Sequence, residues 1–196
     1  MTNRCADSYK NFPFAQASRI RLLVLDVDGV LSEGHIFLND TGEQAKEFNV
    51  RDGHGIKMLQ RAGVKIAILT GRTSQVVKHR ARELGIEYVV QGSLKKEEGL
   101  DQLEKQTGID SGDFVYMGDD IVDLPPMRRC ALSAAPADAH AAVLAKVDWV
   151  SGHAGGRGAV RQLCEALILA RNEWDTVVAG PYGVLAADCG WLPDQA

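Results

Sequence analysis

The sequence predicts an α/β fold in which a doubly wound, Rossmann-like parallel sheet is covered by helices on both faces. Two observations support this: short apolar runs alternate with segments of helical periodicity, and the runs are continuously apolar, as strands buried on both faces are. The predicted strands are 20–26, 64–69, 87–90, 114–117, 131–134 and 147–150. In such a sheet the ligand crevice lies at the carboxyl ends of the strands.

The segment after the first predicted strand interrupts this alternation. Residues 34–38 and 43–48 are short extended runs on either side of an Asn/Asp/Gly turn at 39–42. They predict a β-hairpin flap over about 34–48, inserted after the first strand. The next helix is expected to begin at Asp52, a good N-cap, and to end at Arg61 before Gly63.

Two later helices are predicted from apolar stripes that recur with helical spacing. The first has four apolar residues on one face: Val76, Val77, Ala81 and Leu84. The last helix, about 158–172, buries a longer stripe: Val160, Leu163, Cys164, Leu167 and Ile168. We therefore expect a single domain over 19–172, with an N-terminal extension at 1–18 and a tail without clear periodicity at 173–196.

The composition excludes several functional classes. The chain has 196 residues, of which 45% are hydrophobic and 24% charged, as in one soluble globular domain. A net charge of −4 and scattered basic residues argue against nucleic-acid or membrane-surface partners. No apolar run approaches the roughly 18 residues of a membrane span. The four cysteines are far apart and form no CxxC pair, which favours reduced thiols and a cytoplasmic location.

Two carboxylates, Asp26 and Asp28, lie at the end of the first predicted strand and just beyond it, in Asp26-Val-Asp-Gly29. At the end of a strand, one carboxylate can act as a nucleophile while the other transfers protons. Gly29 allows the sharp turn that brings both to one crevice. The pattern alone is weak, because paired aspartates often form a turn or cap a helix.

Polar residues occupy the same relative position after three later strands: Thr70, Lys96, and the pair Asp119 and Asp120. Separately, they could be an N-cap, a solvated lysine and a capping pair. Together they would meet Asp26 in one crevice, where converging carboxylates raise one another's pKa. Mg²⁺ held by Asp26, Asp119 and a backbone oxygen would relieve this repulsion, and a substrate phosphate would complete the site.

These segments resemble motifs one to four of the haloacid dehalogenase superfamily of phosphohydrolases. A second aspartate at the position of Asp28 resembles the pattern of the phosphatase branch of this superfamily. The chain has no large insert between Gly29 and Thr70, and in this it resembles the capless subclass. Over about 19–172 the chain is most similar to the 3-deoxy-D-manno-octulosonate 8-phosphate phosphatases. The segments that carry this similarity are 48–53, 70–72, 91–92, 118–120 and 155–159.

The resemblance implies Mg²⁺-dependent hydrolysis of that phosphorylated sugar acid, in lipopolysaccharide precursor biosynthesis, through an aspartyl-phosphate. Asp26 would be the nucleophile and a metal ligand. Asp28 would be the general acid/base, would contact substrate, and would bind Mg²⁺ through its backbone carbonyl. Thr70 and Lys96 would steady the phosphoryl group, and Asp119 would ligate the metal.

The resemblance also implies supporting and substrate-binding residues. Asp120 would orient Lys96 or a metal-bound water. Lys57 stands where relatives often have Arg, Glu83 replaces a small polar residue, and Arg72 favours the octulosonate over the nonulosonate branch. Besides Asp28 and Lys96, the substrate contacts would come from Asn49, Val50, Arg51, Asp52, Gly53, Lys57, Arg72 and Arg80.

The family further implies a homotetramer in which the hairpin flaps meet. The sequence is consistent with this, because Ile36, Phe37 and Leu38 in a short hairpin need burial. The 155–158 segment could start the last helix as a glycine-rich turn, or place Arg157 against a carboxylate of the substrate or of a neighbouring subunit.

Proteins of other functional classes carry some of the same residues. Receiver domains also carry paired aspartates, Thr and Lys at strand ends, but lack a counterpart of Asp28 and are shorter. An inactive homologue would usually have lost one of the four motifs, and all four are intact. Among enzymes, the alternative is a phosphatase of another acidic sugar phosphate, such as a nonulosonate 9-phosphate.

Overall fold

The structure, a computed structural model, describes residues 9, 11–42 and 44–189. Its central sheet consists of six parallel strands in the order β5–β4–β1–β6–β7–β8. Every strand overlaps a predicted apolar run, so the predicted fold class is confirmed, with differences only at strand ends. The strands are β1 (Leu22–Leu25), β4 (Lys65–Leu69), β5 (Tyr88–Val90), β6 (Phe114–Met117), β7 (Leu132–Ala135) and β8 (Trp149–Val150).

The strand order reverses direction at β1. The chain proceeds from β1 to β4 and β5 on one side, then crosses to β6, β7 and β8 on the other. Both neighbours pair with β1 in register, Leu23 lying opposite Ile66 of β4 and Val115 of β6. A reversal of this kind opens a crevice at the carboxyl ends of the central strands.

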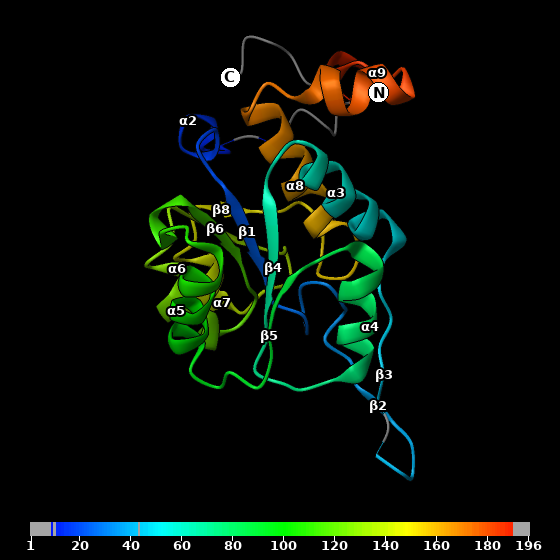
Figure 1. The fold of residues 1–196 in the computed structure, drawn as a ribbon, viewed down its shortest axis with the longest axis vertical. Coiled ribbons are helices and arrows are strands. Elements are labelled where there is room, and N and C mark those ends of the chain that lie inside the picture. Colours follow the sequence, from blue (N-terminus) through cyan, green and yellow to red (C-terminus); the bar gives the residue numbers. More distant parts are fainter. Residues whose placement is uncertain (1–8, 10, 43, 190–196) are drawn as a thin grey trace.

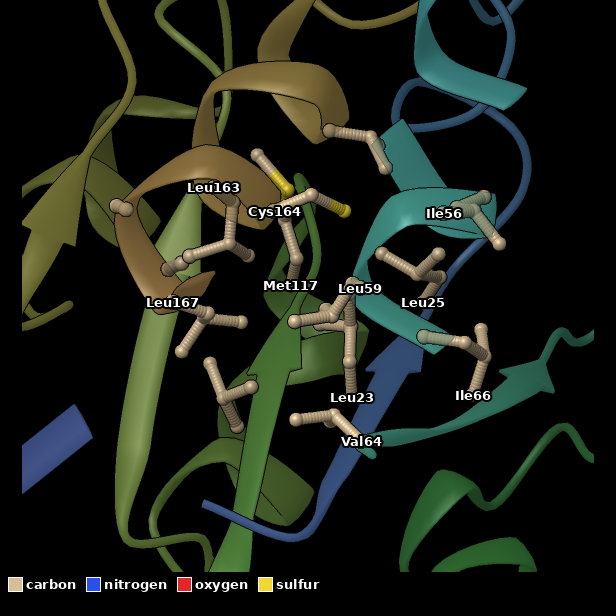
Figure 2. Packing of buried hydrophobic residues seen from close by; sticks show 14 of the residues in the cluster. Leu23, Leu25, Ile56, Leu59, Val64, Ile66, Met117, Leu163, Cys164 and Leu167 are labelled. Atoms are coloured by element: carbon tan, nitrogen blue, oxygen red, sulfur yellow. The ribbon is translucent and has the colours of Figure 1, made fainter. Parts of the chain in front are cut away.

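Helices cover both faces of the sheet (Figure 1). On one face lie α3 (Val50–Arg61), α4 (Gln75–Leu84) and α8 (Ala159–Ala170). Figure 2 shows Ile56 and Leu59 of α3 and three residues of the predicted α8 stripe packing onto the sheet, where Leu23, Leu25 and Met117 lie; the three are Leu163, Cys164 and Leu167. The other face is covered by α5 (Lys96–Thr107), α6 (Leu124–Met127) and α7 (Ala141–Leu144). Alternate residues of β1, β4 and β6 therefore point into two separate cores.

The start of α3 differs from the prediction. Asn49 is the N-cap, and its side chain accepts a hydrogen bond from the Arg51 backbone N–H at 2.8 Å. Asp52, the predicted cap, is instead buried in the first turn. Its carboxylate accepts hydrogen bonds from the backbone N–H groups of Gly158 and Arg161, at 3.3 and 2.7 Å. Asp52 thus ties α3 to the start of α8, and burial raises its pKa.

The segment after β1 contains a short antiparallel pair, β2 (Phe37–Leu38) and β3 (Gln44–Ala45). The turn between them is closed by a 2.9 Å hydrogen bond from the Gly42 N–H to the Asn39 carbonyl, and residue 43 lies outside the described residues. Phe37 and Leu38 are 60% and 64% exposed. The pair extends beyond the carboxyl end of the sheet (Figure 1).

The segment after α8 packs on the protein. It forms a π-helical turn, η3 (Asp175–Ala179), then α9 (Gly180–Tyr182) and a 3₁₀ turn, η4 (Ala186–Cys189). Trp174, Val177 and Val178 are buried, and the Tyr182 hydroxyl contacts α3. Figure 1 shows α9 at the opposite end of the molecule from β2 and β3. The predicted tail is thus docked as far as residue 189, and 190–196 lie outside the described residues.

The remaining short elements lie at the edges of the two cores. Near the N-terminus, α2 (Phe14–Ala17) packs against α8, and two 3₁₀ turns, η1 (Ser111–Asp113) and η2 (Ile121–Asp123), flank β6. No helix in the described ranges is both long and apolar enough to cross a membrane.

Candidate active site

The carboxyl ends of β1, β4 and β6 and the start of α5 bring four predicted residues to one edge of the sheet. Asp26 follows β1, Thr70 follows β4 and Asp119 follows β6, while Lys96 opens α5. The Lys96 ammonium lies 2.9 Å from Asp26 Oδ2. Asp26, Thr70 and Lys96 are all buried. The structure therefore assembles the predicted cluster from segments far apart in the chain.

Asp123 joins this cluster, although no role was assigned to it from the sequence. Its fully buried carboxylate accepts from the Lys96 ammonium and, at 2.8 Å, from the Tyr116 hydroxyl. Its second oxygen accepts from the backbone N–H groups of Asp119 and Asp120, at 3.1 and 3.2 Å. Asp123 thus fixes both the lysine and the loop after β6. The spacing of one helical turn from Asp119 was the available signal.

Asp120 was expected to orient Lys96 or a metal-bound water, but its side chain does not contact Lys96. Its side chain is exposed and caps η2, accepting from the Ile121 backbone N–H at 2.7 Å. The buried Asp123, three residues later, takes that place because the turn of η2 points it inward. Asp120 nevertheless belongs to the same capping box as Asp123.

Two of the carboxylates are held in an environment that disfavours their charge. Burial, opposed mainly by Lys96, raises the pKa of Asp26 to about 6. Burial together with the nearby Asp26 and Asp123 raises the pKa of Asp119 to about 7. Asp119 Oδ1 is buried and has no hydrogen-bond partner among the described residues. A bound cation would remove this penalty.

The residues at this edge fit a hard divalent cation such as Mg²⁺. Asp26, Asp119 and Asp123 each offer an oxygen within 4.8 Å of the others. Because both oxygens of Asp123 already accept hydrogen bonds, Asp26 and Asp119 are the carboxylates left for a metal. Oxygen ligands of this kind suit Mg²⁺.

Gly29 allows Asp119 to approach the loop after β1. A Cβ at Gly29 would lie 2.1 Å from Asp119 Oδ2, and the φ of +92° also favours glycine. Any side chain here would therefore displace the carboxylate from the site.

Asp28 lies beside the cluster, with its side chain 21% exposed. Its Oδ1 pairs with the ammonium of Lys46, which directly follows β3. Arg72 Nε lies 3.9 Å from Oδ2. Arg72 itself is 47% exposed, on the loop after Thr70.

The predicted substrate segment lies at the start of α3, held by Arg80 of α4. Arg80 donates a 3.4 Å hydrogen bond to the Asn49 carbonyl and lies over the Phe48 ring at 5.7 Å. Its other terminal nitrogen donates a 2.9 Å hydrogen bond to the Glu83 carboxylate. Glu83, which replaces the small polar residue expected from the resemblance, is therefore a partner of Arg80. Val50 and Arg51 are exposed in the first turn of α3.

Three other predicted substrate residues do not face the crevice within one chain. Asp52 caps α8, and Gly53 is packed against Arg80, whose Nη2 would lie 2.4 Å from an added Cβ. Lys57 lies two turns after the start of α3, in a pocket of about 430 Å³ beside Lys65 and Tyr88. Since those two residues begin β4 and β5, this pocket is at the opposite edge of the sheet.

The glycine-rich segment before α8 packs against the loop after β1. Gly156 donates a 2.9 Å hydrogen bond to the Val30 carbonyl, and a Cβ at Gly155 would lie 1.7 Å from the Gly29 oxygen. Arg157 is exposed and pairs with Glu33 at 2.8 Å, so the carboxylate that it reaches is on its own chain. The segment therefore supports the loop that carries Asp26 and Asp28.

The sequence relatives decide the family. Residues 52–130 match the haloacid dehalogenase-like hydrolase model. The chain is 44% identical over 161 residues to the 3-deoxy-D-manno-octulosonate 8-phosphate phosphatase KdsC of Escherichia coli, covering 82% of this chain and 86% of the relative. The Yersinia pestis KdsC is 42% identical over 158 residues, covering 81% and 84%. The chain belongs to the KdsC phosphatase family.

Solved KdsC-family structures share this fold. The phosphatase from Moraxella catarrhalis, in complex with magnesium ion, phosphate ion and KDO, superposes with a TM-score of 0.82 at 37% identity, covering 88% of this chain and 98% of that one. The cobalt-bound Haemophilus influenzae phosphatase gives 0.81 at 38% identity, covering 86% and 99%. As a member of the KdsC family, the chain is a phosphoric monoester hydrolase.

Proposed function

We propose that this chain is a Mg²⁺-dependent phosphatase that hydrolyses 3-deoxy-D-manno-octulosonate 8-phosphate, a step in lipopolysaccharide precursor biosynthesis. The observation that carries the proposal is the buried cluster of Asp26, Lys96 and Asp123 beside Asp119. It occurs in a chain whose KdsC relatives bear that activity in their names.

In the first step, an Asp26 carboxylate oxygen attacks phosphorus and the bond from phosphorus to the sugar oxygen breaks. Asp28 donates its proton to the departing oxygen, giving the sugar alcohol and an aspartyl-phosphate. Lys96 holds one Asp26 oxygen at 2.9 Å, which orients the carboxylate for attack through the other. Asp123 in turn fixes Lys96.

In the second step, a water oxygen attacks the phosphorus of the aspartyl-phosphate. Asp28, now a carboxylate, takes a proton from that water, and the bond from phosphorus to the Asp26 oxygen breaks. Inorganic phosphate leaves and both aspartates return to their starting states. Lys96 and the Thr70 hydroxyl would hold the phosphoryl oxygens throughout.

Mg²⁺ would be held by Asp26, Asp119 and the Asp28 carbonyl, and it supplies positive charge that neutralises the phosphoryl oxygens. Asp120 would support this site only indirectly, through the loop that Asp123 anchors.

The sugar acid would be recognised by cationic and polar groups around the crevice. Arg72 would bind the substrate carboxylate, because a planar guanidinium matches a carboxylate with two parallel hydrogen bonds. Asn49, Val50 and Arg51 would contact the sugar at the exposed start of α3. Arg80 would add a contact beside them, from this chain or a neighbouring copy.

We further propose a cytoplasmic homotetramer assembled through the hairpins. Exposed Phe37 and Leu38 support this, because an isolated two-residue pair is marginally stable without a partner surface. The free thiols of Cys130 and Cys164 suit a reducing compartment.

The test is a phosphate-release assay of the full-length protein with and without Mg²⁺. We expect 3-deoxy-D-manno-octulosonate 8-phosphate to give a higher kcat/KM than any nonulosonate 9-phosphate, and chelation of Mg²⁺ to abolish release. A higher kcat/KM with a nonulosonate 9-phosphate would overturn the proposed substrate but would leave the proposed mechanism unchanged. No release from any sugar phosphate would overturn the proposed function.

A further inference from the structure

Lys46 is a lysine with a buried side chain, and none of the four motifs includes it. It directly follows β3, at the base of the hairpin, and its side chain has no exposed area. Its ammonium pairs with Asp28 Oδ1. Lysine is almost never fully buried unless its charge is paired, because an unpaired buried ammonium is strongly disfavoured. The contact with Asp28 is therefore the partner that this lysine requires.

The pair determines which Asp28 oxygen is available for chemistry. Lys46 occupies Oδ1, whereas the Arg72 guanidinium lies 3.9 Å from Oδ2, beyond hydrogen-bond distance, and its side chain is half exposed. Asp28 follows β1 in the irregular segment before Gly29, so the sheet does not hold its carboxyl group. A general acid must lie within about 2.6–3.2 Å of the atom it protonates. A group outside the sheet must therefore hold the Asp28 carboxyl group in position.

We propose that Lys46 is the positioning residue for Asp28, binding Oδ1 so that Oδ2 carries the transferred proton. The proposal rests on the acid/base role of Asp28 in the proposed function. Oδ1 is the carbonyl oxygen when Asp28 is protonated and can accept from the ammonium in either state. The proton therefore leaves from, and returns to, the same oxygen in both steps.

This arrangement also links the hairpin to the chemistry. Lys46 reaches Asp28 because the chain returns from β2 through β3 to the start of α3. The hairpin thus supplies a group to the site besides any surface it offers to another copy. A shift of about 1 Å in a catalytic group can lower a rate about 100-fold, so the position of Lys46 would affect turnover.

The test compares two leaving groups in the Mg²⁺-loaded, full-length protein. A sugar alkoxide needs a proton to leave, whereas the nitrophenolate of p-nitrophenyl phosphate does not. Since kcat/KM reports the steps up to departure of the leaving group, Lys46→Met should lower it about 10- to 100-fold for 3-deoxy-D-manno-octulosonate 8-phosphate. For the aryl substrate, kcat/KM should change less than about twofold. Lys46→Arg should recover part of the loss with the sugar phosphate. The control variant Lys105→Met, on the exposed face of α5, should leave kcat/KM unchanged for both substrates.

Each other outcome contradicts the proposal. Equal losses for both substrates would mean that Lys46 supports the whole site, and a raised KM for the sugar phosphate with unchanged kcat would make it a substrate ligand. No change would leave it without a role. Asp28→Asn separates these failures from a failure of the proposed function: if it too affects both leaving groups equally, Asp28 is not the general acid.

Discussion

Gly155→Ala tests whether the glycine-rich segment before α8 holds the nucleophile loop in place. The new Cβ would lie 1.7 Å from the Gly29 carbonyl oxygen, and ordinary contact begins at 3.4 Å. The two backbones would have to separate by about 1.7 Å. Because both are main chain rather than flexible side-chain ends, one loop must move.

The expected loss of activity follows from that displacement. A misplacement of about 1 Å can lower a rate about 100-fold, so we expect kcat to fall at least about 100-fold. Overpacking should also lower stability by about 1–3 kcal/mol. Steady-state phosphate release gives kcat, and thermal unfolding gives the stability.

Gly108→Ala is the matched control. Its Cβ meets open space and only the φ of +66° is strained, which costs about 1 kcal/mol. It should lower the melting temperature without lowering kcat. If Gly155→Ala behaved in the same way, with kcat within about twofold of the wild type, the segment would not position the nucleophile.

Three further predictions follow from the site and the hairpin. Asp123→Asn weakens the hydrogen bonds to Lys96 and Tyr116, so it should cost about 2 kcal/mol by chemical denaturation and lower kcat; unchanged values of both would refute the anchoring role. Mg²⁺ requires ionised ligands, and burial raises the pKa of Asp119 to about 7, so calorimetric Mg²⁺ affinity should weaken up to tenfold between pH 7 and pH 6; pH-independent affinity would contradict this. Phe37→Asp should dissociate the assembly in light scattering, and an unchanged mass would exclude the hairpin interface.

The strands, and the meeting of the residues proposed as catalytic at one edge of the sheet, could be predicted from the sequence because both depend on local patterns. Each strand of the sheet is a largely apolar run, and Asp26, Thr70 and Asp119 each follow one within two residues. Parallel topology then brings strand ends together without further information. The same reasoning places Lys96 correctly, since it opens the helix after β5.

The parts that could not be predicted depend on contacts between distant segments. Asn49 and Asp52 are both good N-caps three residues apart, and only the packing of α8 decides that Asp52 serves the other helix. Likewise, the inward turn of η2 selects Asp123 over Asp120 as the partner of Lys96. The place of Lys46 depends on the path of the hairpin, which local propensity does not specify.

Rapid acid quenching with peptide mass spectrometry tests most directly whether Asp26 takes the phosphoryl group from the substrate. The wild-type protein with Mg²⁺ and 3-deoxy-D-manno-octulosonate 8-phosphate should carry one phosphoryl group on the peptide containing Asp26, at Asp26 itself. The Asp26→Asn variant should carry none and release no phosphate. Turnover by the wild type with no phosphorylated Asp26 at any quench time, or turnover by Asp26→Asn, would contradict the account.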